Sequence, residues 1–91
     1  MKNKERNTAD KIADALDLPL DVLRDIPRIE IIGCSRINVE NFRGILDYGE
    51  NSIKINSNTG IIKIDGDGLL IESISDEGVF VQGRILRVEF L

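Results

Sequence analysis

The side chains of this sequence that could perform acid–base chemistry are carboxylates, above all Asp47, Asp65, Asp67 and Asp76. A pair of carboxylates can hydrolyse a glycosidic bond, with one acting as the acid and the other as base or nucleophile. Such a pair must converge in a concave, partly desolvated pocket that raises the pKa of one member. A carboxylate-dependent hydrolase acting on cell-wall glycan is therefore one hypothesis for this chain. Nothing in the sequence indicates a cleft around these residues.

Other common catalytic groups are missing from the sequence. The chain has no histidine, so Ser-His and Cys-His pairs cannot form, and the commonest general base near neutral pH is absent. Cys34 is the only cysteine, and nothing evident beside it would lower the pKa of its thiol. A structural zinc site needs four Cys or His ligands. We therefore expect no catalytic residue, no cofactor and no metal, and a protein that is not an enzyme.

The segment Asp65-Gly66-Asp67-Gly68 could suggest a calcium loop. An EF-hand loop would need another oxygen ligand at position 69, where the chain has Leu69, and helices on both sides. Glycine beside aspartate is also the chemistry of a tight turn, because glycine accepts a positive φ. We interpret the segment as a hairpin turn.

Short segments that alternate apolar and polar residues fill the chain from Arg28 onward. A period of two places one face of each segment on a core and the other in water. Turn residues recur every 8 to 10 residues or so, a spacing typical of all-β domains. We predict a mainly-β fold of about seven or eight short strands in an antiparallel roll or small sandwich, with a β-solenoid as the alternative. The clearest segments are Ile29–Ile31, Ile37–Glu40, Ile53–Ile55, Ile62–Ile64 and Leu86–Phe90.

The first part of the chain has a different period. We predict a flexible N-terminus over 1–7, a helical lid over 8–27 with a helix at 8–17, and a β domain over 28–91. Residues 8–91 would form one folded unit. The helix prediction rests on an apolar stripe at helical spacing, Ala9, Ile12, Ala13 and Leu16.

Composition and charge limit the classes of partner that this chain is expected to bind. The chain is 42% hydrophobic but only 4% aromatic, so Ile, Leu and Val must fill the core. The formal net charge is −4, and an acidic chain without a basic cluster is a poor candidate for binding nucleic acid. We also find no apolar run of signal-peptide length and no stretch of the roughly 20 apolar residues that a membrane span needs. We expect a cytoplasmic protein that does not insert into a membrane.

The stretch Glu40-Asn41-Phe42-Arg43 combines an aromatic residue and an arginine in a predicted turn over 41–44. In the plain interpretation Phe42 covers the end of the sheet. In the functional interpretation Phe42 and Arg43 form an exposed anchor of the kind that dominates protein–protein binding.

The last segment, 84–91, could be a sheet edge that recruits another chain. It alternates apolar residues with Arg87 and Glu89 and carries Phe90 near its end. We predict a homo-oligomer, or a strand-mediated complex with another protein, through this edge or the Phe42 turn. The candidate contact residues are Glu40, Asn41, Phe42, Arg43, Arg87 and Phe90.

A series of segments resembles the YabP/YqfC family of endospore-forming Firmicutes, and the YqfC branch in particular. In the first half these segments are Leu16–Pro19, Asp21–Leu23, Ile26–Ile29, Ile32-Gly33 and Val39–Leu46, and in the second half Gly60–Gly66, Leu69–Ile71 and Val81–Phe90. One departure is Phe42, where the resemblance leads us to expect histidine in many relatives. A chemical role of that histidine would be lost here, which favours a packing or contact role for position 42.

The resemblance implies a sporulation protein made in the mother cell and needed late in spore development. It implies no enzymatic activity and no cofactor. Relatives are often encoded beside a membrane-associated sporulation protein of the YqfD type, so the resemblance also implies a protein partner that could hold this chain at the periphery of a membrane.

Overall fold

The computed structural model describes residues 25–91, which form six strands in a single antiparallel sheet of order β1-β2-β6-β5-β4-β3. The predicted helix at 8–17 and most of the helical lid lie outside these residues. Of the lid, only 25–27 is described, and it is a turn and bend without helix. The strands are β1 (Arg28–Ile32), β2 (Arg36–Glu40), β3 (Phe42–Tyr48), β4 (Ser52–Ser57), β5 (Gly60–Ser75) and β6 (Gly78–Phe90).

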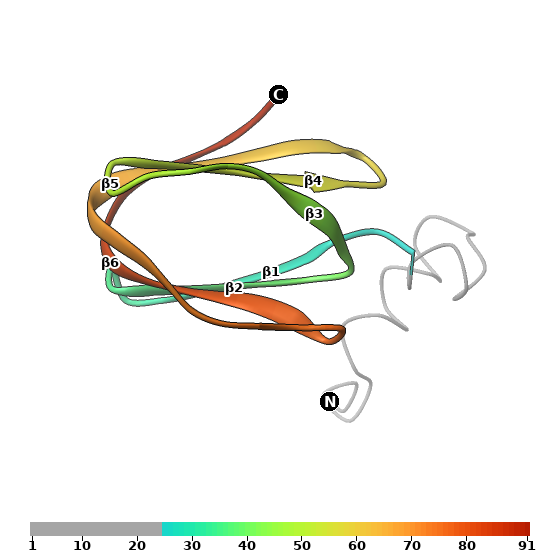
Figure 1. Cartoon of the computed structure of the whole chain (residues 1–91), viewed down its shortest axis with the longest axis horizontal. Coiled ribbons are helices and arrows are strands. Elements are labelled where there is room, and N and C mark those ends of the chain that lie inside the picture. Colours follow the sequence, from blue (N-terminus) through green and yellow to red (C-terminus); the bar gives the residue numbers. More distant parts are fainter. Residues whose placement is uncertain (1–24) are drawn as a thin grey trace, which may run out of the picture.

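The sheet folds back on itself into two facing layers (Figure 1). The strands β5 and β6 are long enough to contribute one half to each layer. The upper layer in Figure 1 holds β3, β4, the first half of β5 and the last half of β6; the lower layer holds β1, β2 and the other two halves. The sheet does not close, because β1 and β3 remain its two edge strands.

The core lies between the layers and is made almost entirely of β-branched residues. Strand β4 alternates buried and half-buried residues along its whole length, as a strand with one face on a core must. Its Ile53 and Ile55 pair with Ile64 and Ile62 of β5, which gives cross-strand rows of isoleucine. Such rows stabilise a sheet through close contact of neighbouring side chains. The fully buried apolar residues are Ile37, Val39, Ile53, Ile55, Ile62, Ile64, Leu69, Val79 and Val81.

The prediction of a hairpin turn at 65–68 is wrong. These residues lie inside β5, at register shifts where it passes from one layer to the other beside β6. A β-carbon on Gly83 would stand 2.7 Å from the carbonyl oxygen of Gly68, and one on Gly66 would overlap the carbonyl oxygen of Arg84. The glycines therefore allow two backbones to touch at the corner of the sheet, which is the other use of glycine in a strand.

The same feature corrects the strand count. Residues 25–91 form six strands instead of the predicted seven or eight, because the sheet bends through bulges where a turn was expected. β6 continues past Gly83 as one long last strand, and the extra residue of the register shift at this point lies on β5. The prediction of a mainly-β antiparallel sheet is confirmed, and the β-solenoid is excluded for residues 25–91 because every neighbouring pair of strands is antiparallel.

The turns of the two hairpins bind the corner in matching ways. In the turn between β1 and β2, the carbonyl of Ser35 accepts a hydrogen bond from the Gly83 amide of β6. The carbonyl of Cys34 accepts one from the Ile85 amide of the same strand. The turn between β3 and β4 likewise accepts hydrogen bonds from Gly66 and Leu69 of β5, through the carbonyls of Asn51 and Glu50. Each of the two hairpins is thus fixed by its turn to one of the two long strands.

Asn38 and Ser57 are the buried polar residues of the described chain, and Asn38 has 6% of its surface exposed. It lies on the face of β2 opposite to Ile37 and Val39, and its Nδ2 donates a hydrogen bond of 3.4 Å to Glu40. Its Oδ1 has no hydrogen-bond partner among residues 25–91. A buried acceptor without a partner is destabilising, because it has lost its bonds to water.

Replacing Asn38 by valine should therefore leave the free energy of unfolding within about 1 kcal/mol or raise it, since both the unpaired acceptor and a poor strand former are removed. Asn38→Asp is the matched control: it places a carboxylate beside Glu40 in the same buried position and should cost about 2 kcal/mol. Urea unfolding followed by circular dichroism measures both. A valine variant that loses more than the aspartate variant would contradict this account.

Candidate functional site

Three of the six predicted contact residues come together where the chain crosses from the lower layer to the upper one. Asn41 alone connects β2 to β3, with a φ of 59°. Asparagine tolerates this left-handed conformation better than most residues, so one residue suffices to redirect the chain. The predicted turn at 41–44 is therefore too long, because residues 42–44 already belong to β3.

Asn41, Phe42 and Arg43 line a shallow, open hollow of about 230 Å³. Asn58, in the turn between β4 and β5, accepts a hydrogen bond from Nε of Arg43 and donates one of 2.7 Å to the carbonyl oxygen of Asp25. Asn41 donates one of 3.0 Å to the carbonyl oxygen of Ile26. The two asparagines thus hold the segment before β1 against the start of β3. The hollow is lined by Asp25, Asn41, Phe42, Arg43, Asn58 and Asp76.

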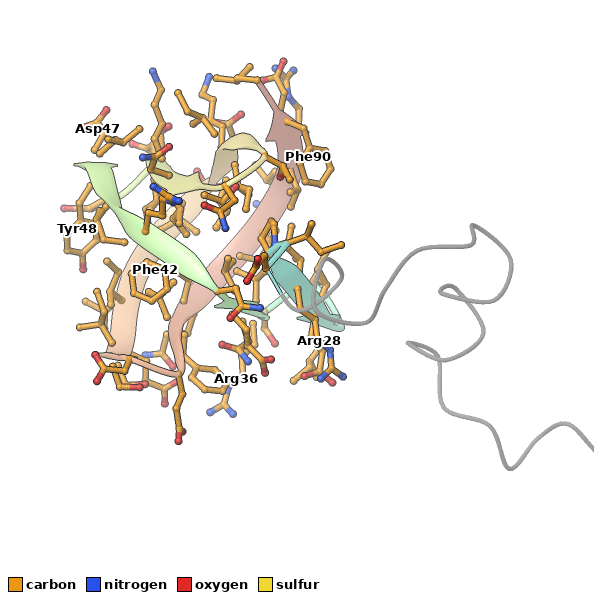
Figure 2. The ribbon with its side chains drawn as sticks, turned by 90° about the vertical axis from the view of Figure 1, so that its right-hand side faces the viewer. Arg28, Arg36, Phe42, Asp47, Tyr48 and Phe90 are labelled. Carbon is orange, nitrogen blue, oxygen red and sulfur yellow. The ribbon has the colours of Figure 1, made fainter. Side chains whose placement is uncertain are left out.

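Phe42 has both roles that the sequence left open. Its ring packs against the hydrophobic core and is partly buried, as expected for a residue that covers the end of the sheet. It also forms part of the wall of the hollow. Figure 2 shows Phe42 on β3, well apart from Phe90 at the far end of β6.

The structure does not bring the other three predicted contact residues into the hollow. Glu40 directs its carboxylate to Arg28, 3.8 Å away, and to Asn38. Arg87 and Phe90 belong to the last half of β6, with β4 and β5 between them and β3. The six residues therefore form two separate groups on opposite sides of the upper layer, with Glu40 beside the first of them.

Arg87 takes part in a network of charges on the outer face of the upper layer. Its guanidinium donates a hydrogen bond of 2.8 Å to Glu89 and lies 3.6 Å from the carboxylate of Asp65. The hydrogen bond to Glu89, together with the attraction of Glu89 and Asp65, raises the pKa of Arg87 above its ordinary value. Lys63 approaches Asp65 from the other side at 3.7 Å.

The prediction of an edge at 84–91 is right for part of this segment. β2 pairs with β6 from Val79 to Gln82, and the carbonyls of its preceding turn continue that contact as far as Ile85. From Arg87 to Phe90, β6 is paired only with β5 among the described residues, and Leu86 lies at a register shift. The sequence did not indicate that β1 and β3 would be the edges of the sheet.

The four carboxylates of the hydrolase hypothesis lie on different parts of the fold. Asp65 and Asp67 lie on β5 and form ion pairs with Arg87 and Arg84, respectively. Asp47 belongs to β3, and Asp76 lies in the turn between β5 and β6, where it borders the hollow. Within residues 25–91, no three Cys, Asp or Glu side chains are grouped so that they could hold a metal ion.

Comparison with known proteins agrees with the resemblance seen in the sequence. The sequence model of the YabP family matches residues 25–91. The chain is also 35% identical, over 77 residues, to the uncharacterized protein YqfC of Bacillus subtilis (strain 168), a match that covers 85% of this chain and 83% of that protein.

The chain belongs to the YabP family.

The part that matches the YabP family model is the same part that forms the six-stranded sheet, and it includes the residues of the hollow and the last half of β6. No solved structure matches this YabP family member. Among its described residues, no helix has the length and apolarity needed to cross a membrane.

Proposed function

We propose that this YabP family member is a non-enzymatic sporulation protein of the mother cell that acts by binding a protein partner at the hollow beside Phe42. The proposal rests on one observation: near Asn41, where the chain crosses between the layers, an aromatic residue, an arginine and two carboxylates line the same hollow. A partner would meet an apolar ring and hydrogen-bonding groups along the same hollow, the usual composition of a binding hot spot.

The geometry of the hollow supports a preformed binding site. Phe42 is fixed by its contact with the core, and Arg43 is held by Asn58. Side chains that are already ordered lose less conformational entropy when a partner binds. The guanidinium of Arg43 remains exposed, so it can pair with a carboxylate of the partner in the two-pronged geometry that arginine favours.

The placement of the carboxylates supports a binding role over hydrolysis. Asp65 and Asp67 are neutralised by arginines on the outer face of the sheet, where no described hollow encloses them. A hydrolase would need two of the four aspartates in one pocket, and the described hollow holds only Asp76 of that set. Asp25, which also borders it, belongs to a segment whose carbonyls bind Asn41 and Asn58.

Family membership directs the choice of partner and place. The YqfD-type membrane protein that the resemblance implies is the partner we propose, with this chain bound on the cytoplasmic side of a mother-cell membrane. No enzymatic step and no cofactor form part of the proposal.

Arg43→Glu should weaken binding to the YqfD-type protein of the same organism at least about tenfold, because it removes the exposed cation and leaves a repelling charge at the rim of the hollow. Arg36→Glu is the matched control: Arg36 is likewise an exposed arginine, ion-paired with Glu72 at 3.5 Å, but outside the hollow. Calorimetry or surface plasmon resonance with the purified soluble part of the partner measures both.

The same two variants test the proposed role in sporulation. A strain lacking the gene should form fewer heat-resistant spores, and the Arg36 variant should restore the count while the Arg43 variant does not. Normal spore counts without the gene would contradict the role in sporulation. Equal binding by both variants would contradict the hollow as the binding site.

A further inference from the structure

The last half of β6 offers a free backbone edge in the upper layer. Leu91 and Ile61 exchange both of their backbone hydrogen bonds. Since bonded and non-bonded pairs alternate along an antiparallel ladder, Glu89 and Arg87 also direct their backbone groups toward β5. The N–H and C=O groups of Val88 and Phe90 therefore point to the opposite side, where the described chain supplies no strand, whereas Leu86 lies at the register shift opposite Asp65 and Gly66.

The side chains along this edge are apolar on one face and charged on the other. Leu86 is 58% exposed and Phe90 70% exposed, while Val88 packs partly against the core beside Ile64. The ladder from Arg87 to Phe90 has no register shift, so this stretch presents its groups at regular spacing. A regular strand with exposed apolar residues and free backbone groups is a template for another strand.

The sequence of the edge is complementary to itself. When two copies lie antiparallel with Val88 opposite Val88 of the second copy, Arg87 faces Glu89 and Leu86 faces Phe90 in both directions. The backbone groups of Val88 and Phe90 face outward, so these two residues of each copy are the ones that bond across the junction. Opposite charges and apolar pairs directly across a ladder both stabilise it. We infer that this edge joins two copies of the chain into a symmetric dimer, centred on Val88.

Charge excludes the neighbouring registers. The outward-facing backbone groups can also meet when the pairing is centred on Arg87 or on Glu89. The first register sets Arg87 against its own copy, and the second sets Glu89 against its own copy, and like charges directly opposite destabilise a ladder. The Val88 register alone pairs unlike charges.

The other open stretches of the sheet are less suited to self-pairing. Strand β3 carries extra residues at two register shifts, which break its regular spacing. The end of β5 has a shift at Glu72, and its Ile71 amide donates to the hydroxyl of Tyr48. Pairing β1 with itself about its middle residue would set Glu30 against Glu30.

This dimer goes beyond the proposed function and does not depend on it. The edge belongs to β6, whereas the hollow borders the start of β3, with β4 and β5 between them. Joining two copies through β6 would extend both upper layers into one continuous layer and leave two hollows at its outer strands.

The test is sedimentation equilibrium of the full chain and of charge variants. We expect the wild-type protein to be a dimer at about 50 µM, and Glu89→Arg to raise the apparent dissociation constant roughly tenfold or more, because both junction pairs become arginine against arginine. Glu89→Arg leaves the ion pair of Arg87 with Asp65 in place but sets an arginine opposite Lys63 of β5, so the fold of this variant must be checked together with its association. Glu30→Arg, the same charge change on the β1 edge, should leave the dimer unaffected.

Charge reversal on both residues supplies the decisive comparison. Arg87→Glu alone should weaken the dimer, whereas the double variant Arg87→Glu/Glu89→Arg again sets opposite charges across the junction and should recover most of the association. Circular dichroism confirms the fold of each variant. A monomeric wild-type protein at 50 µM or so, or a dimer that neither single variant weakens, would overturn the inference. In either case the binding of a partner at the hollow would be unaffected.

Discussion

Alanine at position 66 should destabilise the fold by at least about 3 kcal/mol, because the added methyl group has no room. Its β-carbon would overlap the carbonyl oxygen of Arg84 and also press on Leu69 at 3.0 Å. Relief would require β5 and β6 to move apart at the corner, where the carbonyl of Asn51 also binds the Gly66 amide. Urea unfolding followed by far-UV circular dichroism gives the free energy directly.

Gly44→Ala is the control for this prediction. Gly44 is also a strand glycine, on β3, but a β-carbon there would meet no atom within 4 Å, and its φ is not positive. Alanine at this position should change the free energy of unfolding by less than about 1 kcal/mol. Equal unfolding midpoints for the two variants would refute the close crossing of β5 and β6.

Ile64→Ala should cost about 3 kcal/mol, within the range seen when a buried isoleucine is truncated. Ile64 is fully buried in β5, and its neighbours in the ladder are Ile53 and Val88. With so few aromatic residues in the chain, no large side chain is available to fill the space that the missing atoms leave.

The same substitution at Ile74 makes the comparison quantitative. Ile74 lies on the same strand but is 53% exposed at the end of β5. Its truncation removes little buried surface and should cost less than about 1 kcal/mol. Unfolding in urea measures both variants, and a loss at Ile74 as large as that at Ile64 would mean that the core does not lie between the two layers.

Local pattern was sufficient to locate most strands of this protein. The alternation at Ile37–Glu40 and Ile53–Ile55 predicted β2 and β4. These features depend on neighbours in the sequence, which is why the sequence alone could reveal them.

The order of strands and the corner could not be predicted in the same way. Glycine beside aspartate suits a hairpin turn and a bulge equally well, so Asp65–Gly68 had two interpretations and the wrong one was chosen. The structure resolves them only because Gly66 and Gly83 meet a backbone from another strand. The pairing of Arg36 with Gln82 joins residues far apart in the chain, and no local pattern reports it.

The candidate site could likewise be predicted from the sequence only in part. The unusual combination of Phe42 and Arg43 was visible in the sequence, since an aromatic and an arginine stood together after a strand. The contribution of Asp25, Asn58 and Asp76 to the same hollow depends on the crossing between layers. Ordinary turn residues of this kind carry no signal of their own.

The order in which the strands leave the ribosome also matters for this fold. The hairpin of β1 and β2 is synthesised first, but β6, the strand that joins it to the rest of the sheet, is the last strand of the described chain. An isolated two-stranded hairpin is marginal in water. The first hairpin must therefore wait through the synthesis of four further strands with its apolar face uncovered, and the lower layer can assemble only after β6 has been synthesised.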